Sequence, residues 1–320
     1  MAKPVRSLPV SPVARSMAKR VRGLGAFRSV GFPFVAPTTP GGVEPRRGKS
    51  DIGVDYDTAW ARRYGVRLAR AMVVDNIERP LARFIADPKI SGLDRLAGLK
   101  GPVIFASNHA SHADMPLVLT SVPSRFRHRL VVAAGADYFF DKRWKAVLSA
   151  FALNAVPIDR SRISRRSADL PAELIGEGWS LLIFPEGGRS PDGWGHEHRG
   201  GAAYLATRTG APVVPIHLEG TRRIIKKGAS RPSLASTAVT FGRPLRPEPA
   251  ESSRTFAARI ETGIATLADE QVNGFWEAAK HAAAGTTPTL RGPDAESWRR
   301  TWVLGEGRRR ARKAPAWPKL

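Results

Sequence analysis

Short apolar runs alternate with helical stretches along the middle of the chain, from about residue 98 onward. The runs have the length of buried strands, and alternation of strands with helices is typical of layered α/β proteins. The sequence therefore predicts an α/β fold with a largely parallel or mixed central sheet flanked by helices. The predicted strands are Val103–Ala106, Leu130–Ala134, Ala155–Ile158, Leu181–Phe184, Val213–Leu218 and Ala238–Phe241, and the predicted helices are 115–121, 142–152, 167–177, 200–209 and a closing segment, 253–284.

An amphipathic helical segment is predicted before these strands, from Asp55 to about Ile85. Its apolar residues recur at helical spacing on or near one side, with four arginines beside or opposite them. Pro80 is expected to bend or split the helix. Such a basic amphipathic helix either packs on the main domain or lies in a membrane interface, and both can hold at once. The apolar positions are Trp60, Tyr64, Leu68, Met72, Ile77, Leu81 and Phe84, and the arginines are Arg62, Arg63, Arg67 and Arg70.

The composition indicates a folded protein and excludes sites that depend on cysteine. Hydrophobic residues make up 42% of the 320 residues, which is enough for a folded core. The chain has no cysteine, so a thiol nucleophile, a disulfide framework and a Cys-ligated metal site are excluded. No apolar run reaches the roughly 18 residues of a membrane-spanning helix, and the N-terminus lacks the apolar core of a secretory signal.

The net charge of +23 is concentrated at the two ends. Residues 1–50 hold ten Lys or Arg against a single acid, and residues 291–320 hold nine against three acids. Both ends are expected to be mobile basic arms, over residues 1–50 and 286–320. They attract an anionic membrane surface or simply keep the protein soluble. A nucleic-acid partner is disfavoured, because no helix-turn-helix, zinc-finger or aromatic RNA-binding signature accompanies the charge.

A histidine and an aspartate follow the first predicted strand, in the run Ser107-Asn108-His109-Ala110-Ser111-His112-Ala113-Asp114. This order places His109 at the carboxyl end of a strand, the edge at which open α/β sheets bind ligands, and Asp114 in the first turn of a helix. A helix N-terminus favours the carboxylate, which can bind one imidazole nitrogen and leave the other as a base. A histidine that merely caps the loop is the alternative.

A glycine-rich turn follows the fourth predicted strand, in the run Phe184-Pro185-Glu186-Gly187-Gly188-Arg189-Ser190. Its backbone N–H groups and its guanidinium can hold a phosphate. An ordinary strand-exit turn with a surface ion pair is the alternative. Two more charged elements stand at strand or helix ends, Ile158-Asp159-Arg160 and Arg199-Gly200-Gly201.

Together these segments resemble the 1-acylglycerol-3-phosphate acyltransferase family, the PlsC-like enzymes, over roughly residues 60–245. The match consists of four blocks in the family's order and spacing. Gly188 departs from the pattern, since it stands where the family usually has threonine. The blocks are Asn108-His109-x-Ser111-x-x-Asp114, Ile158-Asp159-Arg160, Phe184-Pro185-Glu186-Gly187-Gly188-Arg189-Ser190 and Val214-Pro215-Ile216, with Arg199-x-Gly201 between the last two.

The resemblance implies transfer of a fatty acyl group from a thioester to the hydroxyl of a lysophospholipid, 1-acyl-sn-glycerol-3-phosphate above all. His109 would take the hydroxyl proton, and Asp114 would orient the His109 ring. Glu186 would position neighbouring groups and pair with an arginine. The residues expected to bind substrate are Asn108, Arg160, Glu186, Gly187, Gly188, Arg189 and Arg199, with Arg160 and Arg189 on the phosphate.

The resemblance also implies partners and domain limits. Acyl-CoA or acyl carrier protein would be the co-substrate, and no bound cofactor or metal is required. Residues 51–97 would be a membrane-association segment and residues 98–285 the acyltransferase domain, peripheral at the anionic cytoplasmic face of the cell membrane. Glycerol-3-phosphate or another lyso- or amino-lipid remains an alternative acceptor. A basic nucleic-acid-binding protein remains the non-enzyme alternative. The intact His109–Asp114 pair argues against an inactive membrane scaffold.

Overall fold

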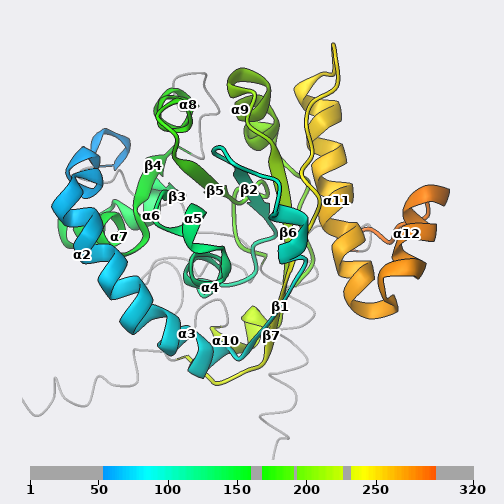
Figure 1. Ribbon diagram of the computed structural model, residues 1–320, viewed down its shortest axis with the longest axis horizontal. Helices are drawn as coiled ribbons and strands as arrows, with labels where there is room; N and C mark the ends of the chain where they lie inside the picture. The colour runs from blue at the N-terminus through cyan, green and yellow to red at the C-terminus, as the bar shows by residue number, and fades with distance from the viewer. Residues whose placement is uncertain (1–52, 160–167, 191–192, 226–231, 293–320) are drawn as a thin grey trace, which may run out of the picture.

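The computed structural model describes residues 53–159, 168–190, 193–225 and 232–292. Their core is a seven-stranded sheet in the order β1-β7-β6-β2-β5-β3-β4 (Figure 1). All neighbouring strands are parallel except β6 and β7, so the predicted mixed α/β fold is confirmed. The strands are β1 Pro88–Ser91, β2 Ile104–Ser107, β3 Leu130–Gly135, β4 Ala155–Ile158, β5 Ser180–Ile183, β6 Val213–Glu219 and β7 Thr237–Phe241.

Helices cover both faces of the sheet. On one face lie α8 (Asp169–Gly176), α9 (Gly201–Thr209) and α11 (Ser253–Asn273), which is the upper side of Figure 1. On the other face lie α4 (Asp114–Ser121) and α7 (Arg143–Leu153). Covering both faces excludes water from the strands, as parallel sheets require.

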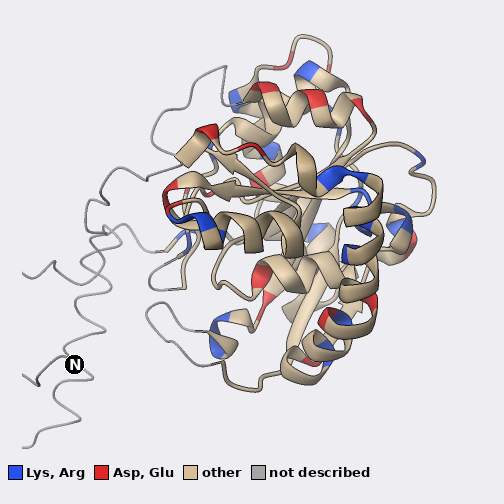
Figure 2. Ribbon diagram, turned by 90° about the vertical axis from the view of Figure 1, so that its left-hand side faces the viewer, with Lys and Arg blue, Asp and Glu red and all other residues tan. Residues whose placement is uncertain are grey.

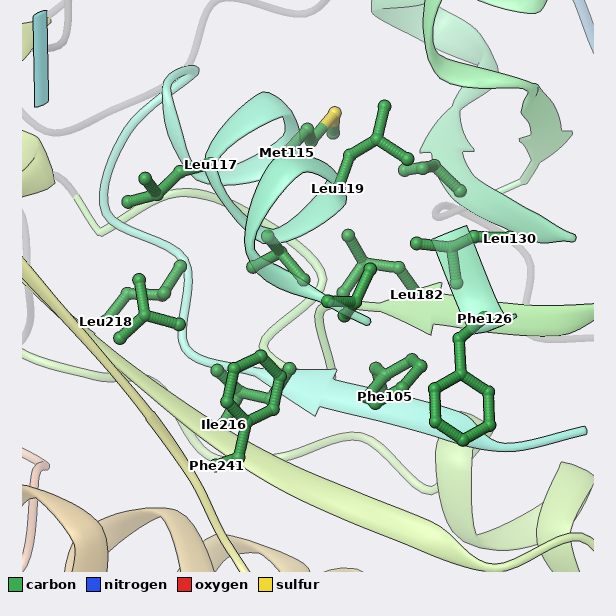
Figure 3. Packing of buried hydrophobic residues seen from close by; sticks show 14 of the residues in the cluster. Phe105, Met115, Leu117, Leu119, Phe126, Leu130, Leu182, Ile216, Leu218 and Phe241 are labelled. Atoms are coloured by element: carbon green, nitrogen blue, oxygen red, sulfur yellow. The ribbon is translucent and has the colours of Figure 1, made fainter. Parts of the chain in front are cut away.

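The central strand β2 shows why its sequence is an unbroken apolar run. Phe105 points into the core on the α4 face, and Ile104 and Ala106 point into the core on the α8 and α9 face. Figure 3 shows Phe105 between Phe126 and Phe241, whose rings meet it edge-on with centroids 5.7 and 6.3 Å away. Each large side chain buried in this way stabilises the fold by about 1.5–3 kcal/mol.

The predicted N-terminal helix is present, but it is interrupted. It consists of α2 (Tyr64–Val73), a π-helical turn (Val74–Glu78) and α3 (Arg79–Ala86). Pro80 lies in the first turn of α3, where proline needs no N–H partner, so the irregular turn precedes the proline. The segment packs on the face of the sheet that α4 and α7 cover.

Helices α2 and α3 expose the apolar side that a surface helix ordinarily buries. The apolar positions Tyr64, Leu68, Met72, Ile77, Leu81 and Phe84 are all exposed, from 52% at Leu81 to 79% at Tyr64. The opposite side faces the protein through Val74, Ala86 and the buried Arg70, whose Nη1 donates to the Ala61 carbonyl. We name the six exposed residues the α2–α3 apolar face.

Several elements were not predicted from the sequence. β1 joins the sheet beside β7, although residues 51–97 were assigned to the amphipathic segment. The closing helix is split at Gly274, which has a positive φ, into α11 and α12 (Phe275–Ala284). Three short helices were also missed, and these are α5 (Ser124–Arg127), α6 (Ala136–Phe139) and α10 (Thr221–Ile224).

The basic arm 1–50 and most of the tail 286–320 lie outside the described residues. The first tail residues, 286–292, pack against the domain, where the Arg291 guanidinium binds both carboxylate oxygens of Glu261 at 2.6 and 2.8 Å. Within the described part, basic and acidic segments are interspersed, as Figure 2 shows for one side. In that same part of the chain, no helix has the length and apolar composition needed to cross a bilayer.

Candidate active site

The carboxyl end of β2 and the start of α4 bring His109 and Asp114 together. The strand ends at Ser107, and a short loop leads to Asp114, the first residue of α4. The Nδ1 atom of His109 lies 2.9 Å from Oδ2 of Asp114. Both residues are buried, with Asp114 fully so. The strand–loop–helix geometry therefore forms the expected imidazole–carboxylate pair.

The Asp114 carboxylate is held from several sides. Its Oδ2 also accepts hydrogen bonds from the backbone N–H groups of Ala110 and Ser111, both at 2.8 Å. The carboxylate stands at the N-terminus of α4, where the helix dipole favours negative charge. Because Oδ2 is fixed in this way, the His109 ring is fixed with it.

The His109 ring is also held by an aromatic contact. It stacks on the ring of Phe184 at the end of β5, with centroids 4.1 Å apart and planes at 25°. Both residues line a cavity of about 500 Å³ that runs from the strand ends to α8 and α9. Most of the lining is apolar, including Ile158, Ile183 and Leu205. An apolar chain could therefore lie directly beside the imidazole.

Glu186 joins the two main segments of the site through the backbone. Its Oε1 accepts from the His109 N–H at 2.8 Å, and its Oε2 accepts from the His196 N–H at 3.0 Å. Burial raises the pKa of Glu186 to about 7, although the two hydrogen bonds oppose this shift, and the Asp114 carboxylate adds to the rise. Among the described residues, the hydrogen bonds to the Glu186 carboxylate come from these two backbone N–H groups, and the expected pairing with an arginine stays a prediction.

The glycines of the turn have different surroundings. Gly187 has a φ of +71°, and a Cβ there would come within 2.8 Å of Nε of Arg199. Gly188 also lines the cavity, but a Cβ at this position would meet nothing within 4 Å. The positive φ therefore favours glycine at 187, and the nearby Arg199 side chain would have to shift for any other residue, whereas at 188 the space is open.

The arginines expected to bind phosphate are placed differently. Arg189 lies with its Cζ 5.8 Å from the centroid of the Tyr138 ring, and this tyrosine in turn stacks on His112 at 4.8 Å. Arg199 lines the cavity beside Gly187. Arg160 lies outside the described residues, although its neighbour Asp159 lines the same cavity.

Asn108 is used within the fold. Its Nδ2 donates to the Leu218 carbonyl at 2.9 Å, and its Oδ1 accepts from the Leu218 N–H at 2.8 Å. Because both ends of the amide bind the β6 backbone, Asn108 anchors the His109 loop to β6. The expected contact of Asn108 with substrate stays a prediction.

The sequence analysis missed the aromatic residues at the site. Phe184 was named as the end of a strand and the first residue of the glycine-rich block but was given no role at the site, and Tyr138 was not singled out. The signal available for Phe184 was its position directly before Pro185-Glu186, at the same sheet edge as His109. Among the described residues, no three His, Cys, Asp or Glu side chains gather in a way that could hold a metal ion.

The histidine–aspartate pair, the glycine-rich turn and part of the cavity lining fall in one segment that is similar to known proteins. The acyltransferase family matches residues 86–219, which contain His109, Asp114 and the glycine-rich turn. The four blocks predicted a resemblance to the 1-acylglycerol-3-phosphate acyltransferases, and the comparisons confirm this resemblance for this part of the chain.

Two plant proteins and one solved structure illustrate the relationship. Over 142 residues, 44% of this chain, it is 32% identical to "1-acyl-sn-glycerol-3-phosphate acyltransferase BAT2, chloroplastic" of Brassica napus and to "1-acyl-sn-glycerol-3-phosphate acyltransferase LPAT1, chloroplastic" of Arabidopsis thaliana. The aligned part covers only 39% and 38% of those proteins. The crystal structure of the 1-acyl-sn-glycerophosphate (LPA) acyltransferase PlsC from Thermotoga maritima shares the fold, with a TM-score of 0.52 and 22% identity over 68% of this chain and 87% of that one.

Proposed function

We propose that this protein transfers a fatty acyl group from acyl-CoA or acyl carrier protein to the hydroxyl of 1-acyl-sn-glycerol-3-phosphate, giving phosphatidate. The observation that carries the proposal is the His109–Asp114 pair, whose imidazole lines an apolar cavity of about 500 Å³. The names of the plant relatives support the choice of acceptor. The pair supplies a base, and the cavity has room for a hydrocarbon chain.

The proposed reaction depends on which imidazole nitrogen is bound to Asp114 and which is left to accept a proton. Asp114 binds Nδ1–H of His109, so the lone pair lies on Nε2. Nε2 removes the acceptor's hydroxyl proton while the oxygen attacks the thioester carbonyl. A carbon–oxygen bond forms, the carbon–sulfur bond breaks, and the departing sulfur takes the proton from the imidazolium. Asp114 stabilises that imidazolium and keeps the ring in place.

The acceptor's phosphate lies, in this proposal, near the glycine-rich turn. Arg189 supplies a guanidinium on the side of Tyr138, and Arg199 supplies another along the cavity. The other groups expected to bind the phosphate are Arg160 and the backbone N–H groups of Gly187 and Gly188. Glu186 organises this turn rather than acting as a second base, because it holds the His109 and His196 backbone N–H groups and does not line the cavity.

The α2–α3 apolar face supports a peripheral position on a membrane. Six large apolar side chains of α2, α3 and the π-helical turn between them are exposed, and Arg63 and Arg83 are exposed as well. Inserting each apolar side chain into the acyl region of a leaflet contributes up to about 1.5–3 kcal/mol. We propose the cytoplasmic leaflet, because its anionic lipids attract the basic residues of this protein.

An acyl-transfer assay in vitro tests the activity. The purified full chain receives radiolabelled acyl-CoA or acyl carrier protein with lysophosphatidate, glycerol-3-phosphate, a lysophospholipid without a phosphate monoester, or an amino-lipid. Phosphatidate from lysophosphatidate is expected at the highest rate, and His109→Ala is the control. Product from none of these acceptors, or from glycerol-3-phosphate above lysophosphatidate, would contradict the proposal.

A further inference from the structure

Helix α7 carries an exposed apolar stripe of its own. Trp144, Val147 and Leu148 lie on one side of the helix at helical spacing and are 63%, 42% and 56% exposed. The opposite side of α7 packs on the sheet through Ala146 and Ala150. Neither the core nor the proposed reaction accounts for a tryptophan and a leucine left in water.

This stripe lies on the same face of the molecule as α2 and α3. Both α7 and the α2–α3 segment cover the sheet face of α4, and α2 contacts α7 directly (Figure 1). Each has its inner side against the protein and its apolar residues exposed. A surface that accepts the α2–α3 apolar face therefore also lies within reach of α7.

A chain of ring contacts connects this stripe to the catalytic loop. The ammonium of Lys145 lies 6.0 Å from the Trp144 ring centroid and 5.3 Å from that of Tyr138. The Tyr138 ring in turn stacks on His112, which stands between His109 and Asp114 in the sequence. The exposed end of α7 is thus adjacent to the side of the site that bears Arg189.

We propose that α7 is a second membrane-contacting element, and that Trp144 and Leu148 insert into an anionic phospholipid leaflet beside the entrance for the acceptor. The exposed cations Lys142 and Arg143 at the start of α7 complement such a leaflet. Tryptophan favours the interface between lipid headgroups and acyl chains. The bilayer is preferred to a second copy of the chain because the stripe continues a surface already proposed to meet lipid. This inference rests on the proposed function for its substrate.

The test compares two surface tryptophans of the full chain. The double variant Trp144→Ser with Leu148→Ser removes the stripe, and Trp276→Ser on α12 is the matched control, since Trp276 is 76% exposed. Binding is measured by co-sedimentation with vesicles of phosphatidylcholine and phosphatidylglycerol. Activity is measured with long-chain lysophosphatidate in those vesicles and with a short-chain lysophosphatidate dissolved as monomers.

The double variant is expected to bind vesicles about tenfold more weakly and to lose activity on vesicles by a similar factor. Its activity on the monomeric acceptor should stay within about twofold of wild type, and Trp276→Ser should change neither measurement. Unchanged vesicle binding would overturn the proposal, as would equal loss on both acceptors. Sedimentation showing a wild-type dimer that the double variant dissociates would assign the stripe to self-association instead. If the wild type acylates neither acceptor, the proposed function fails, while vesicle binding still tests α7.

Discussion

The imidazole of His109 lies against the ring of Phe184, with the two centroids 4.1 Å apart. The stacking sets the tilt of the imidazole ring, and the hydrogen bond from Nδ1 to Asp114 sets the direction in which Nδ1 points. Both are fixed before any substrate binds. A base held in advance avoids the cost of ordering it during the reaction. Phe184 is therefore a positioning residue that joins the end of β5 to the chemistry at the end of β2.

His109→Ala should lower kcat by at least about a hundredfold, because general-base assistance is worth roughly 10²–10⁴. The side chain lies in a loop at the sheet edge and not in a helix or strand, so the far-ultraviolet circular dichroism should change little. Steady-state turnover with saturating thioester is the measurement. A variant retaining more than about a tenth of wild-type turnover would remove His109 from the role of base.

Arg189→Ala should raise the acceptor KM by about tenfold or more, because a charge-assisted hydrogen bond to phosphate contributes about 1.5–3 kcal/mol. The KM for the acyl thioester should stay unchanged. Arg129→Ala, an exposed arginine at the opposite edge of the sheet, is the matched control. An equal rise in both KM values for Arg189→Ala would show that the guanidinium does not select the acceptor.

Gly187→Ala and Gly188→Ala should lower the free energy of unfolding by different amounts. At 187 the positive φ and the 2.8 Å approach to Arg199 oppose any side chain, so a loss of about 1–2 kcal/mol in the free energy of unfolding is expected. At 188 the space is open, and the loss should stay below about 0.5 kcal/mol. Urea unfolding measures both variants, and comparable losses would contradict the assignment.

The stability of the protein should carry a pH dependence from Glu186. Its pKa is about 7 in the folded protein against 4.5 for the free group, because burial disfavours the carboxylate. Between these two values the folded state holds a proton that the unfolded state releases, so the free energy of unfolding falls as pH rises through this window. The fall is at most about 3.5 kcal/mol, since each pKa unit is worth about 1.4 kcal/mol.

Urea unfolding of wild type and Glu186→Gln at about pH 4.5 and about pH 7 measures this contribution. Wild type should lose stability relative to the glutamine variant over that interval. Burial also lowers the pKa of His198 to about 4, so this histidine makes the free energy of unfolding rise with pH. Because His198 is present in both proteins, its effect cancels when the two are compared. A difference between the two proteins that does not change with pH would place the Glu186 pKa near its ordinary value.

Leu68→Ser combined with Phe84→Ser should weaken binding to anionic vesicles by about tenfold or more, because both side chains belong to the α2–α3 apolar face. They are 53% and 72% exposed, so the melting temperature should not fall. Flotation with vesicles is the measurement, and raised salt should release the wild type further. A drop in melting temperature with unchanged flotation would show that this face packs within the protein.

Local patterns were enough to predict most of the sheet and the His109–Asp114 spacing. The apolar run around Phe105 predicts a buried strand because both of its faces contact core residues. β1 escaped prediction because Lys89, Ile90 and Ser91 are exposed on an edge strand whose partner, β7, lies about 150 residues away. A strand of that kind has no apolar signature of its own.

Local patterns in the chain were enough for the strand–helix alternation, the amphipathic helix and the residues able to supply a base and cations, since each depends on neighbours within one or two turns. The outward-facing apolar side of α2 and α3, the contact of Asn108 with Leu218 and the support of His109 by Phe184 depend on the packing of the whole domain. Periodicity shows that a helix has two different sides but not which one meets the protein. Contacts between segments 75 to 110 residues apart depend on how the whole sheet packs.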